Sequence, residues 1–195
     1  VLAGAGMAMC GLVMQMLTQN RFVEPTTTGT TEWAGLGLLV VMLFFPDAPL
    51  MVRMVGAVAA AFVGTMIFFL FLRRVVLTSS VIVPIVGMML GAIVGAVSTF
   101  IALSTHTLQS MAIWFTGSFT SVLRGQYEPL WIVLFVVIAI FIAADRFTIA
   151  GLGKEVATGV GVDYDRVVLI GTGLIALAAG GVTGVVGKTP PPPRG

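Results

Sequence analysis

The residue types that most often carry enzymatic chemistry are scarce in this chain of 195 residues. His106 is the only histidine and Cys10 the only cysteine, and they accompany 8 carboxylate side chains. A catalytic triad needs a base beside a nucleophile, and acid–base catalysis by carboxylates needs two of them close together. No spacing in the sequence brings such groups together, so we expect no catalytic residue, no metal site and no cofactor.

A single cysteine also excludes a disulfide within the chain and a cysteine-based zinc site. Cys10 lies in an apolar run, and we expect it to be a small buried side chain. The phosphate-binding pattern GxxxxGK followed by Ser or Thr is absent from the sequence. If the protein performs energy-driven work, the nucleotide site must therefore lie on a partner.

Glu32 is the ionisable residue closest to the middle of a hydrophobic run, and the centres of the runs contain none. An ionisable group at mid-membrane depth would indicate a substrate or ion pathway. Glu32 lies near one end of its run, however, so an interfacial or loop carboxylate is the simpler interpretation. The lack of central ionisable residues argues against a proton-coupled carrier.

These residues belong to a chain whose composition is that of a membrane protein. Apolar residues make up 58% of the sequence and charged residues 9%, and the mean hydropathy is +1.09. A soluble domain carries roughly 25% charged residues, and this chain has too few to cover a water-facing surface. The formal charge of +2 comes without a basic run, so nucleic-acid binding is excluded as well.

The apolar runs predict an all-α, polytopic transmembrane helical bundle. Lipid offers no partners to backbone N–H and C=O groups, so spanning runs must be helical, and these runs lack the alternation of barrel strands. We expect a partial first span and several complete or nearly complete ones. The partial span covers residues 1–18, and the others cover residues 33–45, 50–72, 81–103, 129–144 and 167–187. The short run at 33–45 spans a membrane only if residues 27–32 are helical or buried in protein.

Charged residues between the runs predict the orientation. Loops on one side carry Arg21, Arg73, Arg74, Arg146, Lys154 and Arg166, and loops on the other side carry Arg53 and Arg124. The positive-inside rule places the first set in the cytoplasm, provided that residues 107–126 do not cross the membrane. Residues 145–166 then form a cytoplasmic segment, in which we expect a short helix over 150–158, ended by Gly159 and Gly161. Such a segment is either a docking surface for a partner or an ordinary interfacial loop.

Glycines recur at intervals of four residues in two of the runs. Gly87, Gly91 and Gly95 share one helix face. Gly180 and Gly184 repeat the spacing in the last run. Small residues at this interval let helix backbones approach closely, so we expect these glycines to serve helix packing.

Three stretches resemble signatures of the FecCD family, the membrane subunits of ATP-binding-cassette (ABC) importers for ferric siderophores, haem and cobalamin. Residues 2–29 are similar to the family pattern LAGAALALSGALMQ…TRNPLAEP…G. Residues 109–119 are similar to its W-x-x-G-S/D-F segment, and residues 152–162 to its LGxxxAxxLGV segment. The details at 21–25 and 122–125 resemble the ferric-siderophore branch more than the cobalamin branch.

The resemblance implies a type II ABC importer permease in the bacterial plasma (inner) membrane, surrounded by lipid. Such a permease pairs with a second permease subunit, as a homo- or heterodimer. Two ABC ATPase subunits bind it from the cytoplasm, and an extracytoplasmic substrate-binding protein delivers the ferric siderophore. ATP hydrolysis would then take place on a separate partner, and the chain itself would be a transporter subunit and not an enzyme.

The resemblance also assigns roles to particular positions. In the family, the loop that matches residues 152–162 forms short coupling helices that dock on the ATPase. The positions that carry over are Leu152, Gly153, Glu155, Ala157 and Gly161. The stretch that matches 109–119 lies near the outer mouth of the pathway, which singles out Gln109, Trp114, Gly117 and Phe119.

The chain departs from the family pattern at both ends. Residues 1–187 match a partial permease domain without the first and the last spans, and residues 188–195 form a proline-rich tail where the family sequence continues. The expected function is the translocation pathway of an ATP-driven siderophore importer. Two alternatives stay open: a secondary carrier or channel of another family, or a truncated remnant that does not transport.

Overall fold

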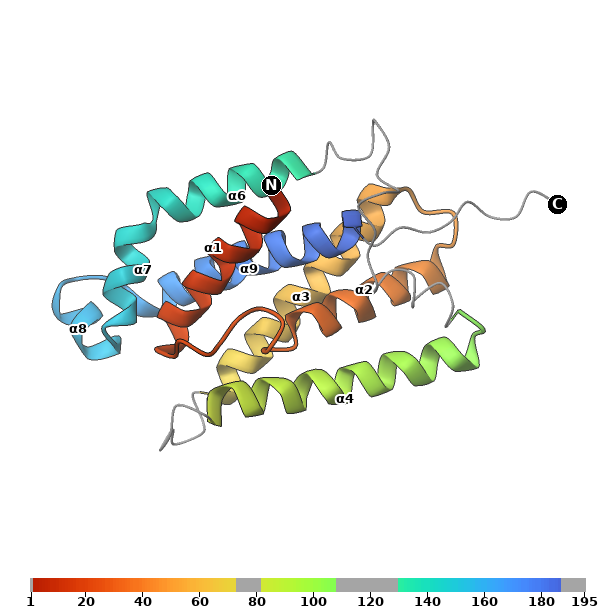
Figure 1. The fold of residues 1–195 in the computed structure, drawn as a ribbon, viewed down its shortest axis with the longest axis horizontal. Helices are drawn as coiled ribbons and strands as arrows, with labels where there is room; N and C mark the ends of the chain where they lie inside the picture. The colour runs from red at the N-terminus through yellow and green to blue at the C-terminus, as the bar shows by residue number, and fades with distance from the viewer. Residues whose placement is uncertain (1, 73–81, 108–129, 187–195) are drawn as a thin grey trace.

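The computed structural model describes residues 2–72, 82–107 and 130–186. Every regular element among these residues is an α-helix, as the sequence predicts. The helices are α1 (Leu2–Thr18), α2 (Thr30–Phe44), α3 (Leu50–Leu72), α4 (Ile82–Ser104), α6 (Leu130–Ile142), α7 (Ala144–Gly151), α8 (Lys154–Gly159) and α9 (Tyr164–Val186). Figure 1 shows the long helices along the long axis of the molecule, with the short helices α7 and α8 at one end.

Three of the described helices are long and apolar enough to cross a membrane: α3, α4 and α9. Each has 23 residues. At 1.5 Å per residue each is about 34 Å long, which exceeds the hydrocarbon thickness of a bilayer. The helices α6 and α7 pass the same test as a pair that is bent by 60°, whereas α1 and α2 are shorter apolar helices. By length and composition the described residues therefore hold three spans, or four with the bent pair, fewer than the sequence runs suggest.

The helix that contains most of the short run 33–45 begins before it, at Thr30. A longer helix or a buried approach is what the sequence requires if this run is to cross a membrane. Helix α2 starts at Thr30, after Gly29, whose φ of 77° lies in the left-handed region. Thr28 and Thr30 are buried. The approach to this helix thus lies inside protein and not against lipid.

The prediction of a single helix over residues 150–158 is wrong. The segment contains two helices, α7 and α8, which are separated at Leu152 and Gly153. Gly153 has φ 110° and ψ 160°, a conformation that side chains with a Cβ rarely adopt and that no helix continues through.

The expected end of the helix is confirmed. Gly161 has φ 81°, and its N–H donates to the Thr158 carbonyl at 3.1 Å. The Val162 N–H donates to the Ala157 carbonyl at 2.8 Å. This pair of hydrogen bonds is the Schellman arrangement that ends a helix on glycine.

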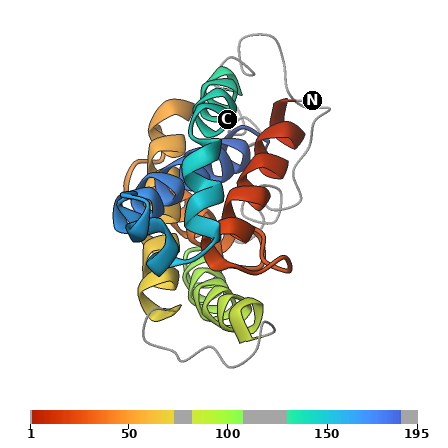
Figure 2. The ribbon, with the colours of Figure 1, turned by 90° about the vertical axis from the view of Figure 1, so that its left-hand side faces the viewer.

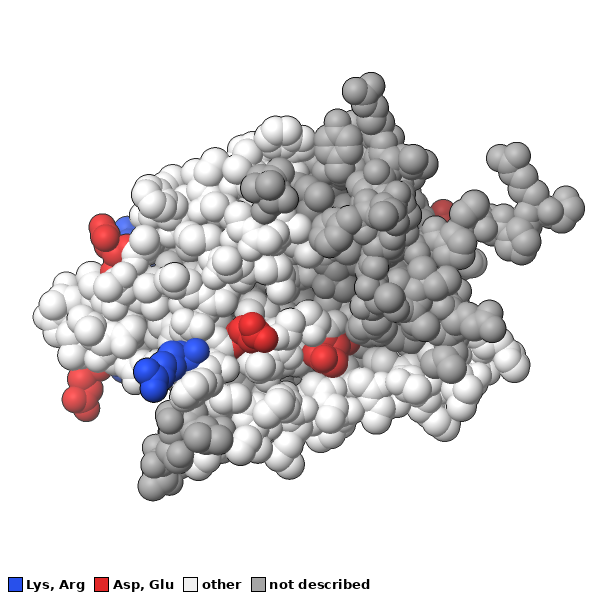
Figure 3. Space-filling model, in the orientation of Figure 1, with Lys and Arg blue, Asp and Glu red and all other residues white. Residues whose placement is uncertain are grey.

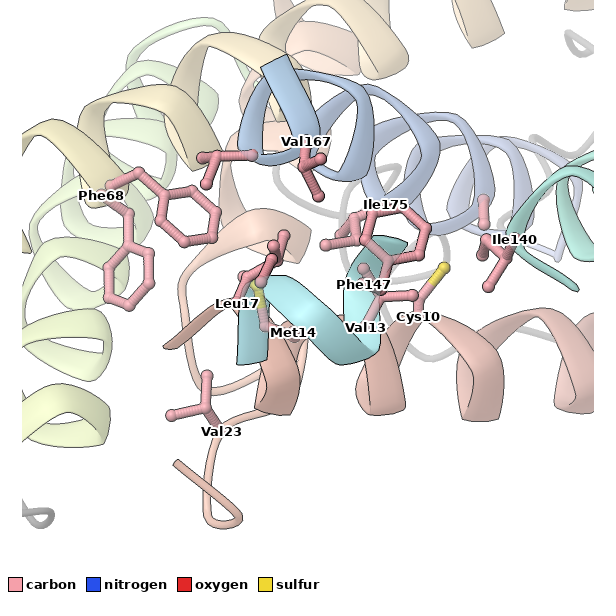
Figure 4. Packing of buried hydrophobic residues seen from close by; sticks show 14 of the residues in the cluster. Cys10, Val13, Met14, Leu17, Val23, Phe68, Ile140, Phe147, Val167 and Ile175 are labelled. Atoms are coloured by element: carbon pink, nitrogen blue, oxygen red, sulfur yellow. The ribbon is translucent and has the colours of Figure 1, made fainter. Parts of the chain in front are cut away.

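The main hydrophobic core lies between α1, α9 and the helices on either side of them. In the end-on view of Figure 2, α9 lies between α3 and α1. Figure 4 shows Val13 and Met14 of α1 facing Phe147 of α7 and Ile175 of α9. Cys10 belongs to this cluster and is fully buried, as predicted.

Helix α4 lies at the edge of the described bundle. It packs on α2 and weakly on α3, and only 28% of its apolar window is buried, compared with 56% for α9. Figure 1 shows α4 alongside α2. Two environments therefore bear on function: the exposed end at α7 and α8, and the junction between α2 and α4.

Candidate functional site

Charged side chains gather at the end of the bundle formed by α7, α8 and the start of α9. The exposed ones are Asp145, Arg146, Lys154, Glu155, Asp163, Asp165 and Arg166. In Figure 3 acidic and basic side chains lie toward this end, at the left of the view, and other acidic side chains lie in the middle of the visible face. A surface of this kind faces water or a water-soluble partner and not lipid.

This end rests on the C-terminal part of α1. Phe147 and Ala150 of α7 are buried, and a Cβ on Gly151 would lie 3.4 Å from the Met16 Cβ. The Tyr164 hydroxyl donates to the Leu17 carbonyl at 3.5 Å. A shift of α7 relative to the bundle would therefore act on α1 directly.

Helix α8 is held more loosely than α7. Its Lys154 Nζ lies 3.4 Å from the Asp165 Oδ2, but both side chains are more than half exposed. A cavity of about 450 Å³ is lined by Lys154, Tyr164 and residues at the ends of α1 and α3. Exposed ion pairs contribute little to stability, so α8 depends mainly on its one buried side chain, Ala157.

The residues predicted for coupling divide into outward-facing and inward-facing ones. Leu152, Glu155 and Gly161 are exposed. Gly153 is half-buried, and a Cβ there would lie 3.1 Å from the Gln19 Nε2. Ala157 is completely buried, so its small side chain packs α8 against the protein itself.

Two outward-facing apolar residues were missed by the sequence reasoning. Val156 of α8 is 46% exposed, and Val160, which follows α8 directly, is 62% exposed. The Val160 N–H bonds back to the Val156 carbonyl, so the two side chains lie on the same side of the helix end. Leu152 precedes them and is 64% exposed. The spacing of four residues between apolar side chains in an otherwise polar segment was the signal that could have identified them. We call Val156, together with Leu152 just before α8 and Val160 just after it, the apolar face of α8.

The loop of residues 19–29, between α1 and α2, contacts α4 through the predicted glycine face. A Cβ on Gly87 would lie 2.3 Å from the Thr27 carbonyl oxygen, and one on Gly91 would lie 3.0 Å from the Gly29 Cα. These two glycines therefore let the backbones of the loop and of α4 touch. Gly95 instead lies beside Glu32: a Cβ on Gly95 would be 4.0 Å from the Glu32 Cγ.

The glycines of α9 are in a different contact. A Cβ on Gly180 would lie 2.8 Å from the Val58 Cα of α3, so the backbones of α3 and α9 approach closely there. Gly184 lies within α9, but its surroundings are outside the described residues. Gln109, Trp114, Gly117 and Phe119, which the resemblance places at an outer mouth, also lie outside the described residues, as does the tail 188–195.

A chain of buried hydroxyl groups ties the loop to α3. The Thr30 hydroxyl lies 3.0 Å from those of both Thr28 and Thr65. Thr28 donates to the Pro25 carbonyl at 3.0 Å, and Thr65 donates to the Ala61 carbonyl at 2.8 Å. All three threonines are nearly inaccessible to solvent, so every hydroxyl needs and finds a partner.

Glu32 lies close to this loop, in the first turn of α2, and is half-buried. The Thr31 hydroxyl donates to its Oε2 at 2.9 Å. Its carboxyl carbon would be 3.5 Å from a Cβ on Gly91. The carboxylate thus lies against α4, although it belongs to the end of α2. Among the described residues no group of His, Cys, Asp and Glu could hold a metal ion.

Comparisons with known proteins agree with this architecture. A model of the FecCD transport family matches residues 1–189. The petrobactin import system permease protein FatD of Bacillus anthracis is 58% identical over 190 residues, which cover 97% of this chain and 57% of that protein. The petrobactin import system permease protein YclN of Bacillus subtilis is 39% identical, with 97% and 60% covered. The chain therefore spans less than two thirds of the length of these relatives.

A solved structure has the same fold. A metal-chelate type ABC transporter in an inward-facing conformation superposes with a TM-score of 0.76 at 20% identity, over 96% of this chain and 60% of that one. At this identity the likeness concerns the fold alone.

Proposed function

Because the chain belongs to the FecCD transport family, we propose that it forms part of the membrane-spanning permease of an ATP-driven importer for ferric siderophores. The relatives named above are permeases of petrobactin import systems, which supports a siderophore of that kind as the solute. The three helices that are long enough to cross a membrane support a place in a bacterial plasma membrane. Residues 1–195 lack the GxxxxGK phosphate-binding pattern, which supports our proposal that ATP is hydrolysed on a separate ATPase.

The observation that carries the coupling proposal is the exposed end of the bundle at α7 and α8. Its apolar face, Leu152, Val156 and Val160, is surrounded by charged side chains on a segment that rests on α1. Apolar side chains inside a polar rim are typical of protein interfaces. We propose that this face docks on the ATPase, with Glu155 in its rim.

The remaining predicted residues act within the segment. Gly153 supplies the backbone turn that separates α8 from α7, and Gly161 ends α8. Ala157 fixes α8 to the protein. A second permease subunit and an extracytoplasmic binding protein complete the importer. From the resemblance to the family we propose a role at the outer mouth of the pathway for four residues outside the described ones: Gln109, Trp114, Gly117 and Phe119.

Arginine substitutions on α8 test the docking face. The complete permease is reconstituted in proteoliposomes with its ATPase and binding protein, and iron uptake and ATP hydrolysis are measured together. Val156→Arg and Val160→Arg should lower uptake about tenfold, the loss typical of an important interface residue, while hydrolysis by the ATPase continues. Thr158→Arg is the matched control. Thr158 is exposed and lies two residues from both valines, which places it on the opposite side of α8.

The same measurements decide between the alternatives. Normal uptake by both valine variants would show that α8 does not couple transport to the ATPase. Uptake that needs no ATPase but follows an ion gradient would indicate a secondary carrier. The chain of residues 1–195 is then compared with the complete permease, with all partners present in both cases. If only the complete permease takes up iron, this part alone does not transport.

A further inference from the structure

A cavity of about 350 Å³ lies between the start of α2 and the outer surface of α4. It is lined by Thr26, Gly29, Glu32, Met88, Gly91, Ala92 and Gly95. On the α4 side Met88 is accompanied only by glycine and alanine among the described residues, and Glu32 contributes the only charged group in this described lining. The cavity therefore combines a carboxylate with small and apolar neighbours.

Glu32 lies deeper than its position in the sequence suggests. It is in the first turn of α2, but its side chain would be within 4.0 Å of a Cβ on Gly91 or on Gly95 of α4, so it lies beside both glycines. These two glycines lie on either side of the midpoint of α4, a candidate membrane span of 23 residues. The carboxylate consequently lies beside the centre of a span, at the depth where a charge is most costly.

Local structure explains only part of this placement. The N-terminal end of α2 favours a negative charge, and the Thr31 hydroxyl donates to the carboxylate. These interactions reduce the cost of the charge. They do not account for a cavity beside it whose opposite wall contains Met88 and Ala92, both exposed on the described surface.

We propose that this cavity is a binding position for a cationic group, of the protonated amine class, on the solute that the permease carries. A half-buried carboxylate attracts a cation more strongly than a fully exposed one, because water screens its charge less. The Met88 side chain and the small residues of α4 can contact the alkyl substituents of an amine. The inference rests on the transport function proposed above, but its first test does not require transport.

The test uses cysteine modification in the complete permease, with Cys10→Ala and any other cysteines replaced. Met88→Cys places a thiol in the cavity wall, and its modification rates by trimethylammonium and sulfonate thiosulfonate reagents are compared. The ratio of the cationic to the anionic modification rate should be higher at this cysteine than for a free thiol in water. Glu32→Gln should lower this preference about tenfold, because the nearby unit charge is removed, and Glu32→Asp should retain it.

Met89→Cys is the matched control. Met88 is 53% exposed and Met89 62% exposed, but only Met88 lines the cavity. Reaction at Met89→Cys should therefore show no dependence on Glu32. Ala92→Cys is a second reporter in the cavity wall, and it replaces Met88→Cys if that variant does not fold.

Protection by a small cation tests the ligand class. Tetramethylammonium should slow the modification of Met88→Cys, tert-butanol of similar size should not, and Glu32→Gln should abolish the protection. The proposal is overturned if neither cysteine in the cavity wall reacts, since the cavity would then be closed by protein. It is also overturned if the reagent preference or the protection is the same with Glu32→Gln.

Transport then separates this inference from the function on which it rests. Iron uptake with the siderophore of the complete importer should show a higher KM in Glu32→Gln, while Glu24→Gln, an exposed carboxylate of the loop, should leave KM unchanged. If the unmodified importer takes up no ferric siderophore, the proposed function fails whatever the labelling gives. If uptake proceeds with an unchanged KM in Glu32→Gln, the function stands and the cationic site is wrong.

Discussion

The α7–α8 segment and the loop of residues 19–29 both connect long helices, but they differ in exposure and charge. The segment is rich in exposed charged residues and holds α8 by one buried alanine, Ala157. The loop is fixed by buried threonine hydroxyls and by direct backbone contact with Gly87 and Gly91. The contrast suggests that the loop is a rigid part of the bundle, whereas α8 is free to follow a partner.

Rigidity of the loop predicts the largest effect of substitution. Gly87→Leu should unfold the complete permease or lower its midpoint of thermal unfolding in detergent strongly, since even a Cβ would lie 2.3 Å from the Thr27 carbonyl oxygen. Overpacking of this kind costs about 1–3 kcal/mol or more. Gly4→Leu is the control, because this glycine of α1 is exposed and no described residue lies within 4 Å of a Cβ on it. Equal midpoints for the two variants would contradict the close contact.

The buried anchor of α8 should be the next most sensitive position. Ala157→Arg buries a charge and a long side chain at a position with no exposed surface, and should cost about 3 kcal/mol of stability. Val156→Arg, one residue away but exposed, should leave the thermal midpoint unchanged while it impairs coupling. A stable Ala157→Arg variant with impaired coupling would instead make Ala157 part of the docking face.

The threonine chain should contribute a smaller amount. Thr30→Val keeps the shape of the side chain but removes the hydroxyl that joins Thr28 to Thr65, and should lower the free energy of unfolding by about 1–2 kcal/mol. Thr99→Val is the control, because the Thr99 hydroxyl is exposed and, among the described residues, donates to the Gly95 carbonyl of its own helix. Identical unfolding curves for both variants would argue against a fixed loop.

The weakest effect is expected at the ion pair beside α8. Lys154→Ala removes the ion pair with Asp165. Because both side chains are more than half exposed, the free energy of unfolding should change by less than about 1 kcal/mol. The thermal midpoint in low and high salt measures it. A clear, salt-dependent loss of stability would mean that α8 is held by charge, and that it is less free than its packing indicates.

Much of the fold followed from the sequence because helices in lipid are determined locally. A run such as 50–72 must satisfy its backbone hydrogen bonds within itself, so composition and length alone predict α3. The close packing of Gly180 on α3 follows from the spacing of four residues between small side chains, which can be recognised in the sequence. Gly161 ended its helix as expected, because only the residue type and the preceding few residues matter there.

The candidate sites were less predictable, because exposure and neighbours depend on the whole bundle. The sequence could not indicate that Ala157 faces inward while Val156 and Val160 face outward. It also could not indicate the break at Gly153, since a run of helix-compatible residues continues on both sides of it. Such features depend on how α7 and α8 rest on α1.

Glu32 illustrates the same division. The sequence by itself determined that the chain is a helical membrane protein with almost no charge inside its spans, and that Glu32 lies near the end of one run. Only the tertiary structure decided that this end lies beside the midpoint of α4, because α2 starts within the bundle on a loop that packs on Gly87 and Gly91. Position along a chain sets which helix a charge belongs to, whereas its depth in the membrane is set by the helices packed around it.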